Sequence, residues 1–321
     1  MSQPNYDDVL AAAARLDGHA VHTPLLHALE IDTIVGAEVH FKAECLQHVG
    51  AFKYRGARNR LAAMDEAERA RGVVAFSSGN HAQGVARAAR ELGVDAVIVM
   101  PKDAPAVKVA GVLADGARIV SYDRLSESRE DIATAIAERD GRTLVPSYDD
   151  PFIIAGQGTT GLEIARSGLA FDALVTCIGG GGLCAGISLA MAAESPDTQI
   201  FGAEPEHYDD HRMSLRAGER RRIAKDAPPT ICDAIMTPMP GELTWPINSK
   251  SLQHVFAVSD QDCLYAMRLA KQHLGVTLEP GGAAAMAAVV TGKLPDHYRR
   301  VAVILSGGNV DPAVLEMALN A

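Results

Sequence analysis

Four consecutive glycines, at positions 179–182, constrain the fold of this chain more than any other feature. They stand in the middle of an uncharged stretch from Ala173 to Ala193, which is long enough to be a transmembrane helix. A glycine run is unfavourable inside a helix, whereas a strand, a glycine turn and a second helix are compatible with this sequence. The stretch therefore predicts a strand at 173–178 and a helix at 183–194, with no membrane span.

Short apolar runs alternate with helical runs along the rest of the chain. Strands alternating with helices indicate right-handed βαβ units and parallel sheets, so the fold class is α/β. The turn cluster at 148–151 suggests a domain boundary. Further strands are predicted at 72–76, 96–100, 117–121, 144–146, 199–203, 255–258 and 301–305, and further helices at 81–92, 107–113, 126–140, 260–274, 281–291 and from 312 onward.

Composition excludes several classes of protein. The 321 residues carry a net charge of −10 and no Lys/Arg-rich run, so a nucleic-acid partner is not expected. The five cysteines lack metal-site or disulfide spacing, which favours a reducing compartment and a cytoplasmic location. The polar start of the chain does not resemble a signal or transit peptide.

The glycine run favours an anion site, because backbone N–H groups at a helix N-terminus attract phosphate. A tight turn with close packing is the alternative. Residues 180–185 also match the G-x-G-x-x-A pattern, and Glu204 ends the next predicted strand, where a ribose-binding acid would lie. An NAD(P)-dependent Rossmann dehydrogenase therefore stays open at this point.

Lys53 lies between two aromatic residues, Phe52 and Tyr54, in a glycine-flanked run. A desolvated lysine has a lowered pKa and can form a Schiff base. A surface lysine on an amphipathic helix is the alternative interpretation.

Five motifs together resemble the serine/threonine dehydratase family of fold-type-II pyridoxal-phosphate (PLP) enzymes, to which serine racemase belongs. They occur in the family's order, at Phe52–Ala57, Ser77–Gly84, Gly179–Gly182, Glu279–Ala283 and Ser306–Asn309. The resemblance implies a tryptophan synthase β-like fold of two domains, each with a mainly parallel sheet flanked by helices. Residues 1–65 and 150–321 would form the large PLP-binding domain, and residues 66–149 a small mobile domain.

The resemblance also assigns roles. Lys53 is expected to bind PLP and to act as the general base at Cα. Ser78 would be a second base on the opposite face, or alternatively a loop hydroxyl that caps a helix. Expected cofactor contacts are Phe52, Asn80, Gly179, Gly180, Gly181, Gly182, Leu183, Glu279 and Ser306. Expected substrate contacts are Ser77, Ser78, Asn80 and His81.

The turn at 204–210 is similar to the family's divalent-cation loop. The resemblance implies Glu204, the backbone carbonyl of Tyr208 and Asp210 as ligands. Oxygen ligands fit Mg²⁺, with Ca²⁺ or Mn²⁺ as alternatives. An ordinary acidic turn is the other interpretation.

Two segments, Thr230–Ala234 and Met236–Ile247, make the chain look most like the β-hydroxyaspartate dehydratases, although Ala51 replaces the usual serine before Phe52. A hydroxyaspartate carries a second carboxylate, which needs a cationic partner when buried. Arg129 is the first candidate and His48 the second. Arg129 could instead pair with a neighbouring glutamate, and His48 could be a plain loop residue.

The expected reaction is β-elimination from 3-hydroxyaspartate, giving iminosuccinate and then oxaloacetate and ammonia. An L-serine/L-threonine dehydratase or a serine racemase is the near alternative. A Rossmann dehydrogenase and a non-catalytic PLP-binding protein are more distant ones. The expected partners are a small amino-acid substrate and a second copy of the chain in a homodimer.

Overall fold

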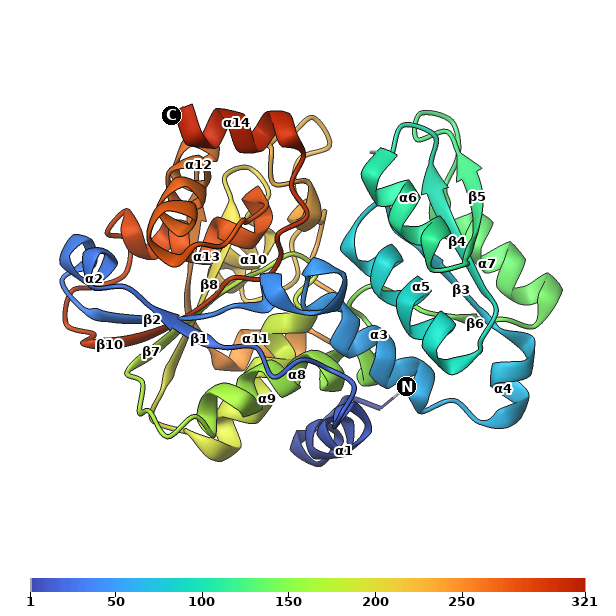
Figure 1. The fold of residues 1–321 in the computed structure, drawn as a ribbon, viewed down its shortest axis with the longest axis horizontal. Coiled ribbons are helices and arrows are strands. Elements are labelled where there is room, and N and C mark those ends of the chain that lie inside the picture. Colours follow the sequence, from blue (N-terminus) through green and yellow to red (C-terminus); the bar gives the residue numbers. More distant parts are fainter. Residues whose placement is uncertain (1, 105, 321) are drawn as a thin grey trace.

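The computed structural model describes residues 2–104 and 106–320, without the side chain at 107, and builds them around two β-sheets (Figure 1). The larger sheet has the strand order β1-β2-β10-β7-β8-β9, and the smaller has the order β5-β4-β3-β6. The larger sheet comprises β1 (Leu25–His27), β2 (Glu38–Lys42), β7 (Ala173–Cys177), β8 (Gln199–Pro205), β9 (Leu252–Val258) and β10 (Arg300–Ile304).

Parallel pairing dominates the larger sheet, in which only β1 and β2 run antiparallel among the described strands. Helices cover both of its faces in Figure 1, with α13 (Pro280–Val290) on one side and α8 (Pro151–Ala165) with α9 (Gly182–Glu194) on the other. Every residue of α13 is buried, because small alanines and glycines let the helix lie close to the strands. The core of this part extends from α13 through the sheet to α9 on the other face.

The smaller sheet is entirely parallel and consists of β3 (Val73–Phe76), β4 (Ala96–Pro101), β5 (Arg118–Tyr122) and β6 (Thr143–Leu144). Two apolar clusters fill its two faces. Figure 1 shows α5 and α6 on one face and α7 on the other. These helices span Asn80–Leu92, Ala106–Ala114 and Arg129–Asp140.

Helix α3 (Lys53–Ala62) lies between the two sheets and packs against both α5 and α8. Glycines allow this close approach: a Cβ at Gly156 would lie 2.7 Å from the Arg55 carbonyl oxygen, and one at Gly84 would lie 3.2 Å from the Lys53 carbonyl. The remaining helices are α1 (Tyr6–Leu16), α2 (Leu29–Val35), α4 (Glu66–Arg71), α10 (Asp210–Ala217), α11 (Trp245–Ser251), α12 (Asp260–Leu269) and α14 (Pro312–Asn320).

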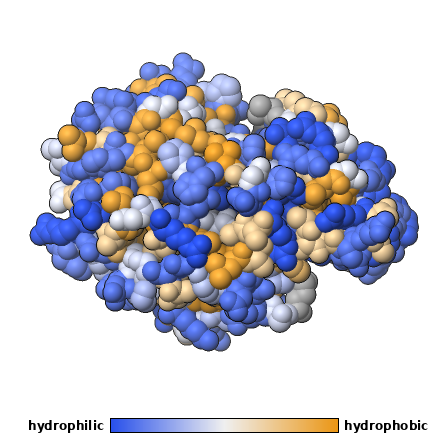
Figure 2. Space-filling model, turned by 60° about the horizontal axis from the view of Figure 1, so that its bottom comes forward, coloured by the Kyte–Doolittle hydropathy of each residue, from blue (hydrophilic) through white to orange (hydrophobic). Residues whose placement is uncertain are grey.

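The α/β fold with parallel sheets is confirmed, and the uncharged stretch is a strand, a glycine turn and a helix as predicted. Among the described residues, no helix is both long and apolar enough to cross a membrane. All five cysteines are free and buried. The face in Figure 2 is mostly hydrophilic, with scattered apolar patches. The domain boundaries and the mobility of the smaller part stay predictions.

Several predicted boundaries differ from the structure for local reasons. The helix predicted from 126 begins at Arg129, because the Ser128 side chain accepts a hydrogen bond from the Asp131 amide and caps it. The helix predicted over 260–274 is α-helical only to Leu269 and ends in a π turn. Helix α8 was not predicted, because its three glycines hide the helical pattern while permitting contact with α3 and α9.

Candidate active site

The loop that follows β10 meets the chain at the N-terminus of α3. The Phe52 amide donates to the Ser306 carbonyl at 3.1 Å, and the Gly308 amide donates to the Gly50 carbonyl at 2.9 Å. Ala51 and Gly307 form a β-bridge in the same place. The loop after β10 therefore holds the residues just before Lys53.

Lys53 is the first residue of α3, and its amine points into this junction. Its Nζ donates to the Ser147 carbonyl at 2.7 Å and lies 5.1 Å from the centre of the Phe52 ring. Burial lowers the pKa of Lys53 to about 8, although nearby Cys177 and Glu279 act in the opposite direction. A fraction of the amine is thus uncharged and nucleophilic near neutral pH.

The glycine loop after β7 ends at the N-terminus of α9. Gly181 has a φ of +96° and caps the helix without any side-chain hydrogen bond, so the first-turn N–H groups have no such partner. A Cβ at Gly180 would lie 2.3 Å from the Tyr148 ring, and one at Gly181 would lie 2.5 Å from Asn248. Only glycines fit here, and they leave a site for an anion.

Hydrogen bonds between side chains connect the motif around Asn80 with the two late motifs, which contain Glu279 and Asn309. The Asn80 side chain donates to the Glu279 carboxylate and accepts from the Asn309 amide at 2.8 Å. Burial raises the pKa of Glu279 to about 7, and its Oε2 has no hydrogen-bond partner among the described residues. The Ser306 hydroxyl accepts from the buried Cys177 thiol at 3.2 Å.

The loop 77–81 leads from β3 into α5. The Ser77 hydroxyl accepts from the Gly79 amide at 3.1 Å, and Ser78 is half-buried beside it. The His81 ring donates from Nε2 to the Val145 carbonyl at 2.9 Å, and burial beside Lys53 lowers its pKa to about 3. The His81 ring is therefore neutral, so any anion contact at this position would come from the backbone N–H.

The two candidate partners for a second carboxylate lie in different surroundings. Arg129 begins α7, pairs with Glu130 at 2.9 Å and lies 5.5 Å over the ring of Phe76, the residue before Ser77. His48 contacts the His19 carbonyl at 3.0 Å and packs edge-on against Tyr54. The structure thus brings Arg129 to the edge of the site, whereas His48 is held by contacts with other parts of the chain.

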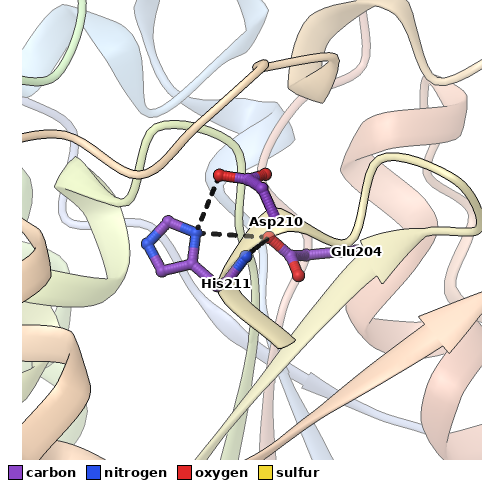
Figure 3. Close-up of side chains that lie close together, drawn as sticks. All are labelled: Glu204, Asp210 and His211. Atoms are coloured by element: carbon purple, nitrogen blue, oxygen red, sulfur yellow. Dashed lines mark hydrogen bonds and ion pairs between the residues drawn. The ribbon is translucent and has the colours of Figure 1, made fainter. Parts of the chain in front are cut away.

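A buried acidic cluster lies between β8 and α10 (Figure 3). Glu204 accepts hydrogen bonds from the backbone amides of His211 and Arg212, each at 3.1 Å. Neither oxygen of Asp210 has a hydrogen-bond partner among the described residues. Burial raises the pKa values of both carboxyls, that of Glu204 to about 7.

His211 completes this cluster and was missed by the sequence reasoning. Its Nδ1 lies 3.2 Å from Glu204 Oε1 and 3.5 Å from Asp210 Oδ2. Potential ligand atoms of the three side chains all lie within 4.8 Å of one another. Its position next to Asp210 in the sequence was the available signal. Tyr208, the third predicted ligand, is buried in the turn just before Asp210.

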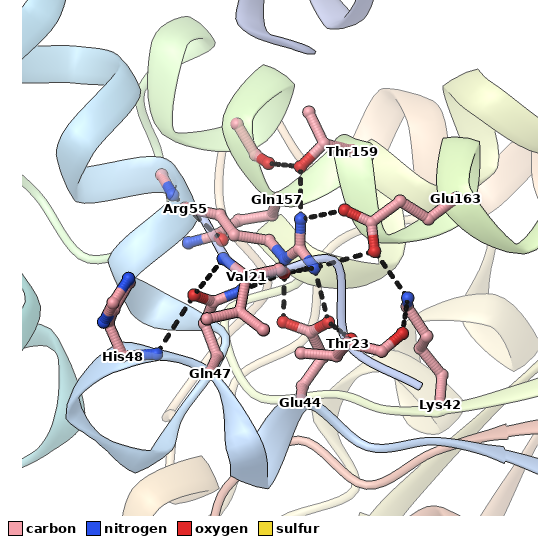
Figure 4. Close-up of polar contacts among 12 residues, drawn as sticks. Val21, Thr23, Lys42, Glu44, Gln47, His48, Arg55, Gln157, Thr159 and Glu163 are labelled. Carbon is pink, nitrogen blue, oxygen red and sulfur yellow. Dashed lines mark hydrogen bonds and ion pairs between the residues drawn. The ribbon is translucent and has the colours of Figure 1, made fainter. Parts of the chain in front are cut away.

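A second buried ionic cluster surrounds Arg55 (Figure 4). Its guanidinium forms two 2.8 Å hydrogen bonds with Glu44 and a 2.6 Å hydrogen bond with Glu163. Lys42 donates to Glu163 and to the Thr23 carbonyl, and the Thr23 hydroxyl donates to Glu44. The cluster joins β2 and α3 to α8 and so fixes the helix that begins with Lys53.

Comparison with known proteins agrees with this geometry. The chain is 45% identical over 97% of both lengths to an L-threo-3-hydroxyaspartate ammonia-lyase of a Pseudomonas species. It is 40% identical to a serine racemase of Schizosaccharomyces pombe, over 96% of this chain and 95% of the relative. The structure of maize serine racemase superposes with a TM-score of 0.94 at 36% identity, covering 99% of this chain and 98% of the other.

The profile of the family described as pyridoxal-phosphate dependent enzyme matches residues 16–307, which is most of the chain. With this match and these identities, the chain belongs to the family of pyridoxal-phosphate-dependent enzymes.

Proposed function

We propose that the protein is a PLP-dependent ammonia-lyase that eliminates water from 3-hydroxyaspartate. The elimination gives iminosuccinate, and addition of water to the imine gives oxaloacetate and ammonia. The observation that carries the proposal is the Lys53 amine, with its lowered pKa, held by Ser147 beside Tyr148, which packs against the uncapped glycine loop. The Pseudomonas relative supports the choice of substrate.

The residues present fit the cofactor. The free N–H groups at the start of α9 and the glycines that no side chain could replace suit a phosphate group. Gly179, Gly180, Gly181, Gly182 and Leu183 would hold that phosphate, and Phe52, Asn80, Glu279 and Ser306 would surround the ring. When bound, PLP supplies an aldehyde for the lysine amine and a ring that accepts electrons from Cα.

The chain's own groups then have defined tasks. Lys53 takes the proton from the substrate Cα, which its lowered pKa permits near neutral pH. The Ser77 hydroxyl and the backbone N–H groups of Ser78, Asn80 and His81 would bind the α-carboxylate, because the N-terminus of α5 has no side-chain cap. The β-hydroxyl leaves as water, and the proton that it gains balances the one that Lys53 removes from Cα.

Arg129 would select the substrate by binding its second carboxylate. The Arg129 side chain is 42% exposed, and its guanidinium lies over the ring of Phe76, which comes just before the loop that would bind the first carboxylate. The contact with Glu130 would be exchanged for one with the ligand. His48 is the weaker candidate, since its ring already contacts His19 and Tyr54.

A divalent cation held by Glu204, the Tyr208 carbonyl and Asp210 is part of the proposal. The two unpartnered oxygens of buried Asp210 support it, because a buried carboxylate needs a cation or hydrogen bonds. With oxygen ligands alone, Mg²⁺ would be expected, and Ca²⁺ or Mn²⁺ are the alternatives. We also propose a homodimer, a small domain at 66–149 that moves against the rest, and a cytoplasmic location.

Serine racemisation is the second candidate function, and Ser78 is the observation that favours it. Its hydroxyl lies in the loop 77–81, where a second base could serve the opposite face of Cα. The S. pombe relative, a serine racemase, supports the same idea.

The test is an assay of keto-acid release from PLP-loaded protein. Erythro- and threo-3-hydroxyaspartate are compared with L-serine and L-threonine, and D-serine is measured in parallel. We expect turnover of a hydroxyaspartate, lost in Lys53→Ala. Replacing Arg129 by alanine should raise KM for hydroxyaspartate about 10- to 100-fold and leave serine unaffected. Arg124→Ala, which removes an exposed arginine paired with Asp103, is the matched control. Preference for serine or threonine would overturn the substrate assignment.

A further inference from the structure

His211 directs a ring nitrogen, Nδ1, at the proposed cation site, whose other expected ligands are all oxygen atoms. Its Nδ1 lies 3.2 Å from Glu204 Oε1 and 3.5 Å from Asp210 Oδ2, and all three side chains are fully buried. Neighbouring donors around one ion at about 2.1 Å lie about 3 Å apart, so this spacing suits three ligands of one ion. The orphaned oxygens of Asp210 point independently to a missing cation.

The other ring nitrogen of His211 has a partner that could hold the ring for metal binding. His211 Nε2 lies 3.2 Å from Asn248 Nδ2, and Asn248 Oδ1 is buried without a hydrogen-bond partner. If the Asn248 amide turns over, Oδ1 accepts from Nε2–H, and Nδ1 presents its lone pair to the carboxylates. The Gly181 carbonyl then loses the Asn248 amide but keeps the Ala185 amide at 2.8 Å.

We propose that His211 Nδ1 is a ligand of the cation held by Glu204 and Asp210. The nitrogen donor makes the site select first-row transition divalent ions such as Mn²⁺ over Mg²⁺ and Ca²⁺. Imidazole binds transition ions well, whereas Mg²⁺ and Ca²⁺ prefer oxygen. This inference rests on the cation site of the proposed function and changes the ion expected there.

Spin-echo spectroscopy of bound Mn²⁺ tests the ligand directly. The PLP-loaded protein is stripped with a chelator and given one equivalent of Mn²⁺. We expect ¹⁴N modulation in the wild-type protein, replaced by ¹⁵N modulation when the histidines are ¹⁵N-labelled. This measurement needs no substitution. A bound Mn²⁺ signal without nitrogen modulation would overturn the inference.

Variants then assign the nitrogen. His211→Asn replaces it with an amide and should lower the ratio of Mn²⁺ to Mg²⁺ affinity at least about tenfold while removing the modulation. His207→Asn makes the same change at an exposed position of the same turn, where φ is +69°, and should change neither value. An unchanged ratio and modulation in His211→Asn would exclude His211 as the ligand.

Asp210→Asn distinguishes two negative outcomes: that His211 is not a ligand, and that no cation binds at Glu204 and Asp210 at all. We expect it to abolish tight Mn²⁺ binding. His211→Asn could leave the affinity ratio and the modulation unchanged while Asp210→Asn abolishes Mn²⁺ binding. That result would support the cation site and exclude His211 as its ligand. If Asp210→Asn binds Mn²⁺ as tightly as the wild type, both the site and the inference fall.

Discussion

The two buried ionic clusters differ in how completely their charges are matched. Around Arg55, two cations meet two carboxylates, and every carboxylate oxygen has a hydrogen-bond partner. Around Asp210, two carboxylates meet one imidazole, and two oxygens have no partner among the described residues. We interpret a cluster whose carboxylate oxygens all have hydrogen-bond partners as structural. We interpret one with unpartnered oxygens as a ligand site. Burial alone does not distinguish structural charges from functional ones, but the match of partners does.

Breaking the matched cluster should have the largest effect. Arg55→Ala leaves Glu44 buried without its main partner, so we expect the free energy of unfolding to fall by about 3–5 kcal/mol. Arg139→Ala removes an arginine that is 71% exposed and paired with Asp140, and should change it by less than about 0.5 kcal/mol. Urea unfolding of both variants makes the measurement, and equal losses would contradict the distinction.

Binding of a divalent ion to the cluster around Asp210 should have the second-largest effect on the free energy of unfolding. At about 100 times its Kd, a divalent ion should add about 2.7 kcal/mol to the free energy of unfolding. Glu163→Gln should lower the starting stability and keep that gain, while Asp210→Asn should lose the gain. Unfolding curves with Mn²⁺ and with chelator provide the comparison. A gain that disappears in Glu163→Gln would mean that the two clusters are not independent.

Lys53 extends the comparison, because it is a half-buried cation whose hydrogen bond goes to a backbone carbonyl and not to a carboxylate. Its pKa of about 8 means that the reactive neutral amine increases about tenfold per pH unit below pH 8 and levels off above it. The rate at which the cofactor-free protein takes up PLP, followed by absorbance, should show this plateau. A rate that still rises at pH 10 would indicate a solvated amine.

The smallest effect is expected when Asp210→Asn is examined in chelator. Burial raises the pKa of Asp210 above its unfolded value, so without an ion its charge costs stability as the pH rises through and above its usual range. The variant should therefore be more stable relative to the wild type at pH 8 than near pH 4. Urea unfolding at the two pH values measures this. A loss at pH 8 would place Asp210 among the satisfied groups.

The sequence predicted the positions of the active-site loops well, because each loop directly follows a short apolar run that forms a strand. Residues 77–81, 179–182 and 306–309 each follow a predicted strand, and hydrogen bonds join Asn80 to Asn309 and Cys177, at the end of β7, to Ser306. The nearest partners of Arg55 could not be predicted in the same way. Glu163 lies 108 residues away on a helix whose glycines conceal its period.

His211 shows a different limit. Its proximity to Asp210 in the sequence was visible, but consecutive residues do not usually face one another on a helix. Because α10 begins at Asp210, both side chains leave its first turn and reach Glu204 at the end of β8. The role of Asn248, which comes from α11, depends on how two distant helices pack.

The hydrogen bond from Lys53 to Ser147 has a consequence for how the protein matures. Ser147 lies on the segment that returns from the smaller sheet to α8, so the free amine tethers that segment to α3. A nitrogen committed to a covalent bond with PLP would have fewer protons to donate, so this tether would weaken in the loaded protein. Newly made and loaded chains would then differ in amide exchange and protease sensitivity around the segment between β6 and α8.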